Sequence, residues 1–334
     1  MKFITLLRYF VQSICFLFIV FGSYLGLKKQ NLSFLPFIEA PQEYKQISQE
    51  GKKIIISGPT YPQAFDTYLP IKSCRFLRQT GTFRACFMHF ISESISWKTN
   101  LSFMLPHIFL FLVLAVLFGR LWCGWVCPLG FIQDVLNIIR KKLKLNPILL
   151  SEKKEKTLKS IKYIMFITII LLSFVAGTSA VSWSLRKQIY LSVCQMCPSR
   201  FIFPYLGRWP IVHNFVPLGY GIFTTISLIF LMLVILSFFI KRLWCRICPS
   251  GFLLSFFNRG GFLTKQKETI ICTRCGICAN VCPLNNENLY LEKEKTNIDF
   301  SNCIHCFSCI DFCPEDNCLK VKFLGMKIFR SKFK

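Results

Sequence analysis

Four long apolar stretches alternate with polar, basic segments along this chain of 334 residues. Each stretch holds about 19 to 24 residues, and a helix needs roughly 20 to cross a bilayer. Any one of them could be the core helix of a soluble protein. All four together, in a chain that is 53% hydrophobic, indicate a membrane protein. The stretches lie at about Ile4–Leu27, Leu101–Gly119, Ile161–Trp183 and Leu218–Ile240.

This pattern predicts an α-helical membrane protein with four transmembrane helices. The first stretch is longer than the apolar region of a signal peptide and no small-residue cleavage site follows it, so we expect it to remain as an anchor. The predicted parts are a first transmembrane helix at 1–27, an extracytoplasmic loop at 28–100, a membrane domain at 101–258 with transmembrane helices at about 101–119, 161–183 and 218–240, and a cysteine-rich domain with a basic tail at 259–334.

The net charge of +25 is concentrated beside the predicted spans. Basic residues crowd the connection between residues 140 and 162 and recur through 241–334. Such clusters mark the cytoplasmic side of a membrane protein and attract anionic lipid headgroups, whereas nucleic-acid binding needs a soluble basic face. We therefore predict a multi-pass protein of the inner (cytoplasmic) membrane that contacts the lipid bilayer and binds no nucleic acid. Both termini and the cysteine-rich domain are predicted to be cytoplasmic, with 28–100 and 184–217 outside.

Two runs of four cysteines near the C-terminus share the spacing C-x2-C-x2-C-x3-C-P. This spacing wraps a loop around a [4Fe-4S] cube, and in two-cluster ferredoxins the fourth cysteine of each run binds the other cluster. Zinc is bound by cysteine pairs and has no use for the third cysteine or the proline. The sequence therefore predicts a C-terminal α+β dicluster ferredoxin-like domain, with two [4Fe-4S] clusters that carry single electrons. The predicted ligands are Cys272, Cys275, Cys278 and Cys313 for one cluster, and Cys303, Cys306, Cys309 and Cys282 for the other.

The membrane part contains an internal repeat. Leu121–Phe131 resembles Leu243–Phe252, and both segments carry Leu-Trp-Cys followed by Cys-Pro-x-Gly-Phe at the end of a predicted span. A period of about 122 residues indicates a duplicated unit, so the four spans form two pseudo-repeats. The first copy spaces its cysteines as C-x3-C and the second as C-x2-C.

Two further groups of four cysteines remain, one predicted on each side of the membrane. Four thiolates suit an iron–sulfur cluster or a soft metal ion, and a dithiol that exchanges with a disulfide is a further redox interpretation. The inner group is interpreted as a third redox or metal site, with packing as the alternative. The outer group is left open between structural disulfides and a redox or metal site. The inner group is Cys123, Cys127, Cys245 and Cys248, and the outer group is Cys74, Cys86, Cys194 and Cys197.

The remaining chemistry is sparse. Cys15 and Cys318 fit no pattern and are expected to be inert, and His305 is expected to be solvated. His107 is the one histidine within a predicted span. It is expected to lie at the membrane interface, and as a functional residue it would form a hydrogen bond to a quinone carbonyl. The sequence shows neither a C-x-x-C-H haem motif nor a nucleotide-binding fingerprint.

Two segments near the predicted inner surface have periodic patterns. Residues 129–150 predict an amphipathic helix with Gln133 and Asp134 on its polar face. The stretch from about Leu319 is expected to be one strand and then a solvated basic tail.

Four spans, two Trp-Cys-x2/3-Cys-Pro motifs and a C-terminal dicluster ferredoxin together resemble the NapH-type membrane ferredoxins, a set that also includes NosR and MauN. The resemblance covers the chain from about Leu101, and Trp122–Phe131 and Trp244–Phe252 make it specific. It implies quinol oxidation at the membrane, with quinone as the substrate and electrons passing through the clusters to a protein partner.

The expected function is therefore an integral membrane iron–sulfur protein that passes electrons between the quinol pool and a partner reductase or ferredoxin subunit, as the electron-transfer subunit of a quinol dehydrogenase-like complex. The alternative is a cytoplasmic-facing copper reductase, or a maturation factor for a respiratory metalloenzyme. The resemblance extends to a copper reductase used in oxidase assembly, and thiolate quartets suit copper.

Overall fold

The computed structural model of the chain forms two compact units, each assembled from segments distant in sequence. The ferredoxin unit comprises Met1–Cys15, Ile108–Phe166 and Met232–Lys334, and the loop unit comprises Phe16–His107 and Ile167–Leu231. The structure describes residues 3–22, 24–26, 68–71, 73–74, 82–83, 86–97, 101–178, 181–182, 185–186, 189–207, 222–258, 261–286, 288–291, 298 and 302–332.

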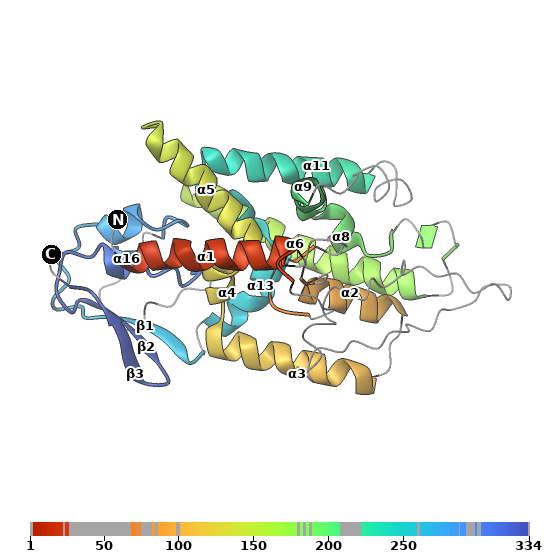
Figure 1. Cartoon of the computed structure of the whole chain (residues 1–334), viewed down its shortest axis with the longest axis horizontal. Helices are drawn as coiled ribbons and strands as arrows, with labels where there is room; N and C mark the ends of the chain where they lie inside the picture. The colour runs from red at the N-terminus through yellow and green to blue at the C-terminus, as the bar shows by residue number, and fades with distance from the viewer. Residues whose placement is uncertain are drawn as a thin grey trace. The chain divides into compact units, whose positions relative to one another are not determined.

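A helix stands at each of the four predicted spans (Figure 1). Two of them, Phe3–Phe21 and Lys153–Gly177, are long and apolar enough to cross a membrane, whereas Met104–Phe118 and Thr224–Phe238 are shorter apolar helices. Of the four expected spans, the described residues thus provide two of full length. The helices are α1 (Phe3–Phe21), α3 (Leu101–Phe118), α6 (Glu152–Gly177) and α11 (Ile222–Ile235), the last continued by the 3₁₀ turn η2 (Leu236–Phe238).

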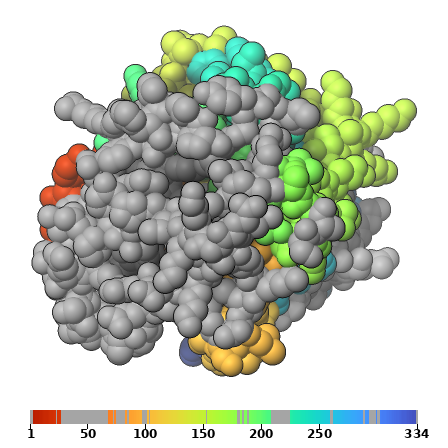
Figure 2. All heavy atoms as spheres, turned by 90° about the vertical axis from the view of Figure 1, so that its right-hand side faces the viewer, coloured from red at the N-terminus to blue at the C-terminus, as the bar shows by residue number. Residues whose placement is uncertain are grey.

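The apolar side chains of these helices are largely exposed. In the window that qualifies as a span, only 33% of α1 and 22% of α6 is buried, whereas the core helix of a soluble protein hides its apolar face. Figure 2 shows the beginning of α3 in gold at the molecular surface, where Leu101 and Leu105 are exposed. Helix α6 begins nine residues before the predicted Ile161, because the preceding Glu, Lys and Leu residues are good helix formers.

Both copies of the repeat fold alike. In each copy a short helix is followed, within two residues, by a cysteine in extended conformation, and the next residue, a proline, starts the next helix. The φ and ψ angles are −62° and 117° at Cys127 and −60° and 124° at Cys248. A residue before proline is restricted to this region, and proline suits the first turn of a helix. The helices are α4 (Leu121–Trp125) and α5 (Pro128–Lys142) in the first copy, and α12 (Leu243–Ile247) and α13 (Pro249–Ser255), continued by η3 (Phe256–Asn258), in the second.

A three-stranded antiparallel sheet in the order β1-β2-β3 supports the cysteine-rich segment. The sheet consists of β1 (Leu263–Lys267), β2 (Leu319–Phe323) and β3 (Met326–Arg330), with the short helices α14 (Ile277–Asn280), α15 (Asn288–Leu291) and α16 (Ser308–Asp311). The prediction of one strand followed by a solvated tail needs one correction: the residues after β2 form a second strand, β3, although most of its side chains are exposed. Gly325 has a φ of +84° in the turn after β2, and β3 pairs with β2 while Phe329 packs against the buried core.

The loop unit contains α2 (Phe87–Trp97), α8 (Ser192–Met196) and α9 (Ser199–Leu206), and α2 packs against α8. Two buried hydrogen bonds connect α2 with other segments of this unit. Ser92 Oγ lies 2.7 Å from Ser173 Oγ, and the Tyr190 hydroxyl donates to Glu93 at 3.0 Å. Most of the predicted extracytoplasmic loop, including all of residues 27–67, lies outside the described residues, as do Trp183 and residues 208–221.

Candidate iron–sulfur centres

The first predicted cluster set is assembled from two loops of the ferredoxin unit. Cys272, Cys275 and Cys278 lie between β1 and α14, and Cys313 follows α16. The sulfur of Cys278 is close enough to the other three to feel their charge, and all four line one pocket. Arg274 and Gly276 have φ values of 56° and 75°, so the loop turns sharply around the thiols.

The second set is built in the same way with the roles of the loops exchanged. Cys303, Cys306 and Cys309 precede or open α16, and Cys282 follows α14, which packs against α16. The structure groups Cys282 with Cys303, Cys306 and Cys309. It therefore brings together the same two sets that the crossover rule selects, and their roles as ligands remain a prediction.

The two sets differ in exposure and in their hydrogen-bond donors. Cys275 is exposed, whereas Cys306 and Cys309 are buried. In the second set, Lys265 Nζ donates to Cys303 Sγ at 2.7 Å and the His305 backbone N–H donates to the same sulfur at 3.3 Å. N–H donors and a cation beside a thiolate stabilise its negative charge. This is the chemistry that a cluster ligand needs.

Cys318 was expected to be inert, but it lies beside the first set. It is 1% exposed and lines the same pocket as Cys272 and Cys313. Its thiol donates to Cys313, and this hydrogen bond lowers the pKa of Cys313. The sequence carried no signal for this position, because it lies four residues beyond the Cys-Pro pattern and directly before β2.

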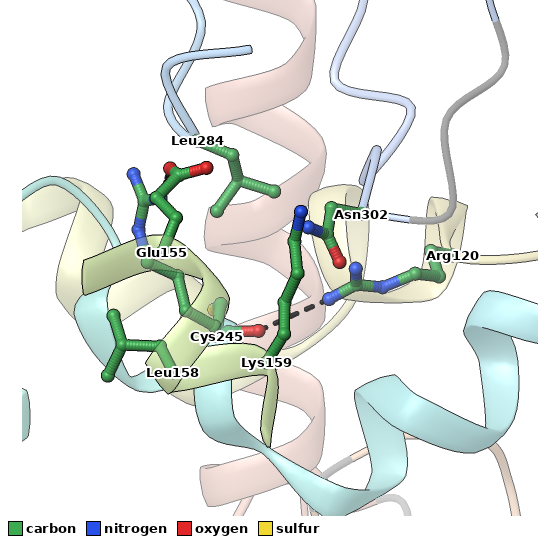
Figure 3. Close-up of a pocket in the computed structure, with 8 residues that line it drawn as sticks. Arg120, Glu155, Leu158, Lys159, Cys245, Leu284 and Asn302 are labelled. Carbon is green, nitrogen blue, oxygen red and sulfur yellow. Dashed lines mark hydrogen bonds and ion pairs between the residues drawn. The ribbon is translucent and has the colours of Figure 1, made fainter. Parts of the chain in front are cut away.

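The inner quartet is also brought together. The thiols of Cys127 and Cys245 each lie near those of Cys123 and Cys248, so both copies of the repeat contribute to one group. Burial raises the pKa of Cys245 to about 11. A pocket reaches Cys245 and is lined by Arg120, Lys159 and Asn302 among others (Figure 3).

Each copy of the repeat contributes a buried arginine that donates a hydrogen bond to the other copy. Arg120 precedes the first motif, and its Nη2 donates to the Cys245 carbonyl of the second at 3.2 Å. Arg242 precedes the second motif, and its Nη1 donates to the Cys123 carbonyl of the first at 2.9 Å. Each side chain passes over the glycine of the opposite motif: a Cβ on Gly251 would lie 3.0 Å from Arg120 Nη2. The glycine of Cys-Pro-x-Gly-Phe therefore leaves room for the arginine side chain of the other copy.

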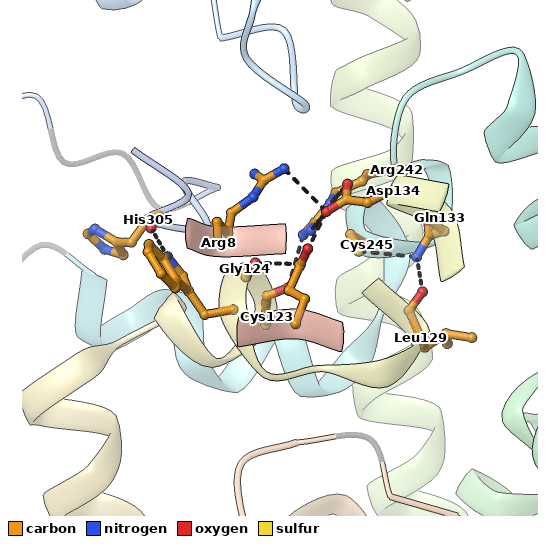
Figure 4. Close-up of polar contacts among 11 residues, drawn as sticks. Arg8, Cys123, Gly124, Leu129, Gln133, Asp134, Arg242, Cys245 and His305 are labelled. Carbon is orange, nitrogen blue, oxygen red and sulfur yellow. Dashed lines mark hydrogen bonds and ion pairs between the residues drawn. The ribbon is translucent and has the colours of Figure 1, made fainter. Parts of the chain in front are cut away.

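Asp134 of α5 is the carboxylate that Arg242 and Arg8 share (Figure 4). It accepts from Arg242 Nε at 2.8 Å and lies 3.4 Å from Arg8 Nη2, while Gln12 Nε2 donates to it at 3.1 Å. Gln133 and Asp134 were predicted on the polar face of an amphipathic helix, and both are buried. Burial alone would raise the pKa of Asp134, but the charges of Arg242 and Arg8 outweigh burial and lower it.

The first motif touches the loop of the second set directly. A Cβ on Gly124 would lie 2.2 Å from the Ile304 carbonyl, and Trp125 Nε1 donates to the His305 carbonyl at 2.9 Å. His305 was expected to be solvated, but it is 1% exposed and its Nε2 lies 3.2 Å from Asn258 Oδ1. The pKa of His305 is lowered by burial and by the charges of Lys265 and Arg120, so its ring stays neutral.

The outer quartet lies in the loop unit and is described less completely. The buried Arg200 lies near the thiols of Cys74 and Cys194, and its Nη1 donates to the Gln195 carbonyl at 3.2 Å. Cys86 forms an isolated β-bridge with Leu69, and the Cys197 carbonyl accepts from Ser227 at 3.3 Å. The choice between disulfides and a redox site therefore stays open.

Within the described part of the chain, no three His, Cys, Asp or Glu side chains are grouped closely enough to hold one metal ion.

Sequence reasoning missed the cationic residues around these thiols. Arg120 and Arg242 each stand one residue before Leu-Trp-Cys, so extending the repeat by one position would have found both. Lys265 and Asn258 lie far from the cysteine runs in sequence and carried no such signal.

Known protein families and relatives are similar to this chain in the segments described above. Residues 264–314 match the family model described as a 4Fe-4S dicluster domain, and residues 100–146 and 222–268 match the model described as a 4Fe-4S binding domain. An uncharacterized protein of Methanocaldococcus jannaschii, MJ0750, is 30% identical over 240 residues, which cover 70% of this chain and 85% of that protein.

Other relatives bear descriptive names. The ferredoxin-type protein NapH of Escherichia coli is 28% identical over 59% of this chain and 60% of its own length, and the regulatory protein NosR of Pseudomonas aeruginosa is 24% identical over 70% of this chain and 29% of its own length. No solved structure matches. The paired motifs and the dicluster segment define an iron–sulfur protein of the ferredoxin type. The chain belongs to the NapH/NosR family of 4Fe-4S ferredoxin-type proteins.

Proposed function

We propose that this chain is an integral membrane electron-transfer protein that passes electrons between the quinol pool and a protein partner through two [4Fe-4S] clusters. The observation that carries this proposal is the continuity of the thiol groups. The first set with its exposed Cys275, the second set with its buried Cys306 and Cys309, and the inner quartet all lie in the ferredoxin unit. The second set and the inner quartet are in contact through Gly124 and Ile304.

The membrane location is supported by the exposed apolar helices. Helices α1 and α6 have the length of a span and leave most of their apolar side chains uncovered, which a bilayer would cover. Helices α3 and α11, with apolar cores of 10 to 17 residues, are proposed as the other two spans.

The orientation follows from which segments meet. The Thr5 backbone N–H donates to Asp311 at 2.9 Å, so the beginning of α1 lies with the dicluster domain. Both motifs lie in the same unit, and basic clusters flank them. By the positive-inside rule we place this unit in the cytoplasm.

The surroundings of the two sets indicate which cluster exchanges electrons with the protein partner. When bound, each cluster takes up and releases one electron. Lys265 and the His305 backbone N–H hold negative charge at Cys303, inside the protein. Cys275 is exposed and the neighbouring Ile270 is 94% exposed, so the first set offers a partner an apolar surface beside a thiol. We therefore place the partner's docking site at the first set.

The quinone would be bound from the membrane side. His107 lies at the start of α3 with the rings of Tyr68 and Phe90, each 5.2 Å from its own ring. These aromatic groups suit a quinone ring, and the imidazole would supply a hydrogen bond to a quinone carbonyl.

The test uses the whole chain in anaerobic membrane vesicles. A menaquinol or ubiquinol analogue is added, and cluster reduction is followed by EPR in wild type and in His107→Ala, with Cys15→Ser as the control variant. Reduction by quinol in wild type and Cys15→Ser supports the proposal. Reduction by dithionite but not by either quinol contradicts it. Stoichiometric binding of copper instead of iron would favour a copper-handling protein.

A further inference from the structure

Helix α2 of the loop unit carries two buried titratable residues, Glu93 and His89. We propose that these two residues accept the two protons that quinol loses when its electrons pass to the clusters. The inference rests on the proposed function, and it adds a route for the protons to the route of the electrons.

The two side chains share one face of α2 because they stand one helical turn apart. Each residue is 5% exposed. The Glu93 carboxylate is approached from two sides. Its Oε1 accepts a hydrogen bond from the Tyr190 hydroxyl at 3.0 Å, and its Oε2 lies 3.6 Å from His89 Nδ1. Each carboxylate oxygen therefore faces a group that can carry a proton.

A purely structural role does not require a carboxylate at this position. Burying an ionisable group is costly, and neutral groups already fasten the same helix to α6. Ser92 Oγ lies 2.7 Å from Ser173 Oγ, and the Ser96 hydroxyl donates to the Ser173 carbonyl at 3.3 Å. A neutral amide oxygen would accept from Tyr190 equally well. What the carboxylate adds is the ability to take up a proton.

The pair lies beside the aromatic group to which the proposed function assigns the quinone. The buried Tyr68 contacts both histidines, because its ring centroid lies 5.2 Å from that of His107 and 6.3 Å from that of His89. An imidazole can bind a proton at one nitrogen and release a proton from the other. His107 thus takes each proton from a quinol hydroxyl and releases it toward the pair.

The capacity of the pair matches the reaction. Oxidation of one quinol molecule breaks two O–H bonds and releases two electrons and two protons. The electrons pass one at a time to the [4Fe-4S] clusters, each of which takes up one. One proton forms an O–H bond at the Glu93 carboxylate, and the other forms an N–H bond at the neutral imidazole of His89. Quinone then leaves.

Tyr190 is a positioning residue in this arrangement. Its backbone carbonyl accepts from Gln195 Nε2 of α8 at 2.7 Å, and its hydroxyl donates to the carboxylate. Removing the hydroxyl leaves both proton-accepting groups in place. Tyr190→Phe is therefore a matched control for Glu93→Gln, because each variant alters the same hydrogen bond and only the second removes a proton acceptor.

The experiment uses the whole chain in anaerobic membrane vesicles. The rate at which a short-chain menaquinol or ubiquinol reduces the clusters is followed by EPR over a range of quinol concentrations. We expect the maximal rate to fall at least about tenfold in Glu93→Gln and less than about threefold in Tyr190→Phe. The quinol KM should change little in Glu93→Gln, and dithionite should reduce the clusters fully in every variant.

Glu93→Asp tests the chemistry of the side chain. It restores a carboxylate, so it should recover most of the rate that Glu93→Gln loses. A rate in Glu93→Gln within about twofold of wild type overturns the inference. So does equal slowing in Glu93→Gln and Tyr190→Phe, since that result is expected of a hydrogen bond that only holds α2 in place.

His89→Gln provides the second variant, for the case in which Glu93→Gln does not retain its iron. It removes the other proton acceptor and should slow reduction by quinol at least about tenfold, and an unchanged rate overturns the inference. Failure of the proposed function gives a different result. In that case wild type itself is reduced by dithionite and by neither quinol, whereas failure of the proton route leaves wild type and Glu93→Gln equally active with quinol.

Discussion

Asp134 illustrates how a single carboxylate can hold three segments of the chain together. In Asp134→Asn, Arg8 and Arg242 would lose their shared counter-charge while remaining buried. Breaking a buried ion pair from one side costs about 3 kcal/mol or more. We expect the thermal unfolding temperature of the purified protein to fall clearly in Asp134→Asn and to change little in Asp316→Asn, which alters an exposed carboxylate.

The pH dependence of this difference follows from the lowered pKa of Asp134. A carboxylate whose pKa is lower in the folded state contributes stability above its ordinary pKa and loses it as the pH falls through the folded value. The gap between wild type and Asp134→Asn should therefore stay constant from about pH 6 to about pH 8. A gap that closes within this range would contradict the assigned ion pairs.

Lys265 gives a second prediction at the scale of one residue. Its ammonium donates to Cys303 Sγ at 2.7 Å and is buried. Lys265→Met should lower the reduction potential of the second cluster by on the order of 60 mV, which is a tenfold change for one electron. EPR-monitored redox titration measures it, and Lys320→Met, whose ammonium pairs with Glu268 instead, serves as the control. A shift confined to the first cluster would contradict this placement.

At the scale of elements, Gly124 sets the distance between helix α4 and the loop of the second set. A Cβ there would lie 2.2 Å from the Ile304 carbonyl, so the backbone itself would have to move. In Gly251→Ala the nearest atom is the end of a flexible arginine side chain at 3.0 Å. We expect Gly124→Ala to cost about 1–3 kcal/mol of stability and to slow the reduction of the second cluster by quinol. Gly251→Ala should be milder on both counts, and equal effects would contradict the contact.

The elements also show how far sequence patterns reach. Spacing alone selected the two cysteine sets that the structure groups, because cluster-binding loops are local and their crossover follows a general rule. Apolar runs located helices α1, α3, α6 and α11, because the length and apolar composition of such a helix are also local properties of the sequence. Strand β3 was missed because most of its residues are exposed and its hydrogen bonds come from β2, which no local pattern displays.

Polar residues were misjudged when their partners lie far away in sequence. Asp134 was assigned to the polar face of a helix and His305 to solvent, because a helix-period or loop pattern shows which residues are polar and does not show their partners. Their partners, Arg242 and Asn258, stand 108 and 47 residues away. Thus the positions of the thiols could be predicted from the sequence, whereas the charges that surround them could not.

For the whole molecule, iron removal should affect one unit and spare the other. The buried core of the ferredoxin unit includes Cys309, Cys313 and Cys318, and the helices beside the cluster sets are four residues long. Such short helices have little stability of their own, so metal binding contributes directly to folding here. The loop unit instead relies on α2 and on residues 167–177 of α6, joined by the Ser92–Ser173 hydrogen bond.

Hydrogen exchange before and after anaerobic chelation of iron tests this division. We expect exchange in residues 263–286 and 302–332 to quicken at least about tenfold, while α2 and residues 167–177 keep their protection. Reconstitution with iron and sulfide should restore the slow exchange, which separates loss of the clusters from damage to the chain. Equal loss of protection in both units would show that the molecule unfolds as one cooperative body, and that the clusters stabilise the loop unit as well.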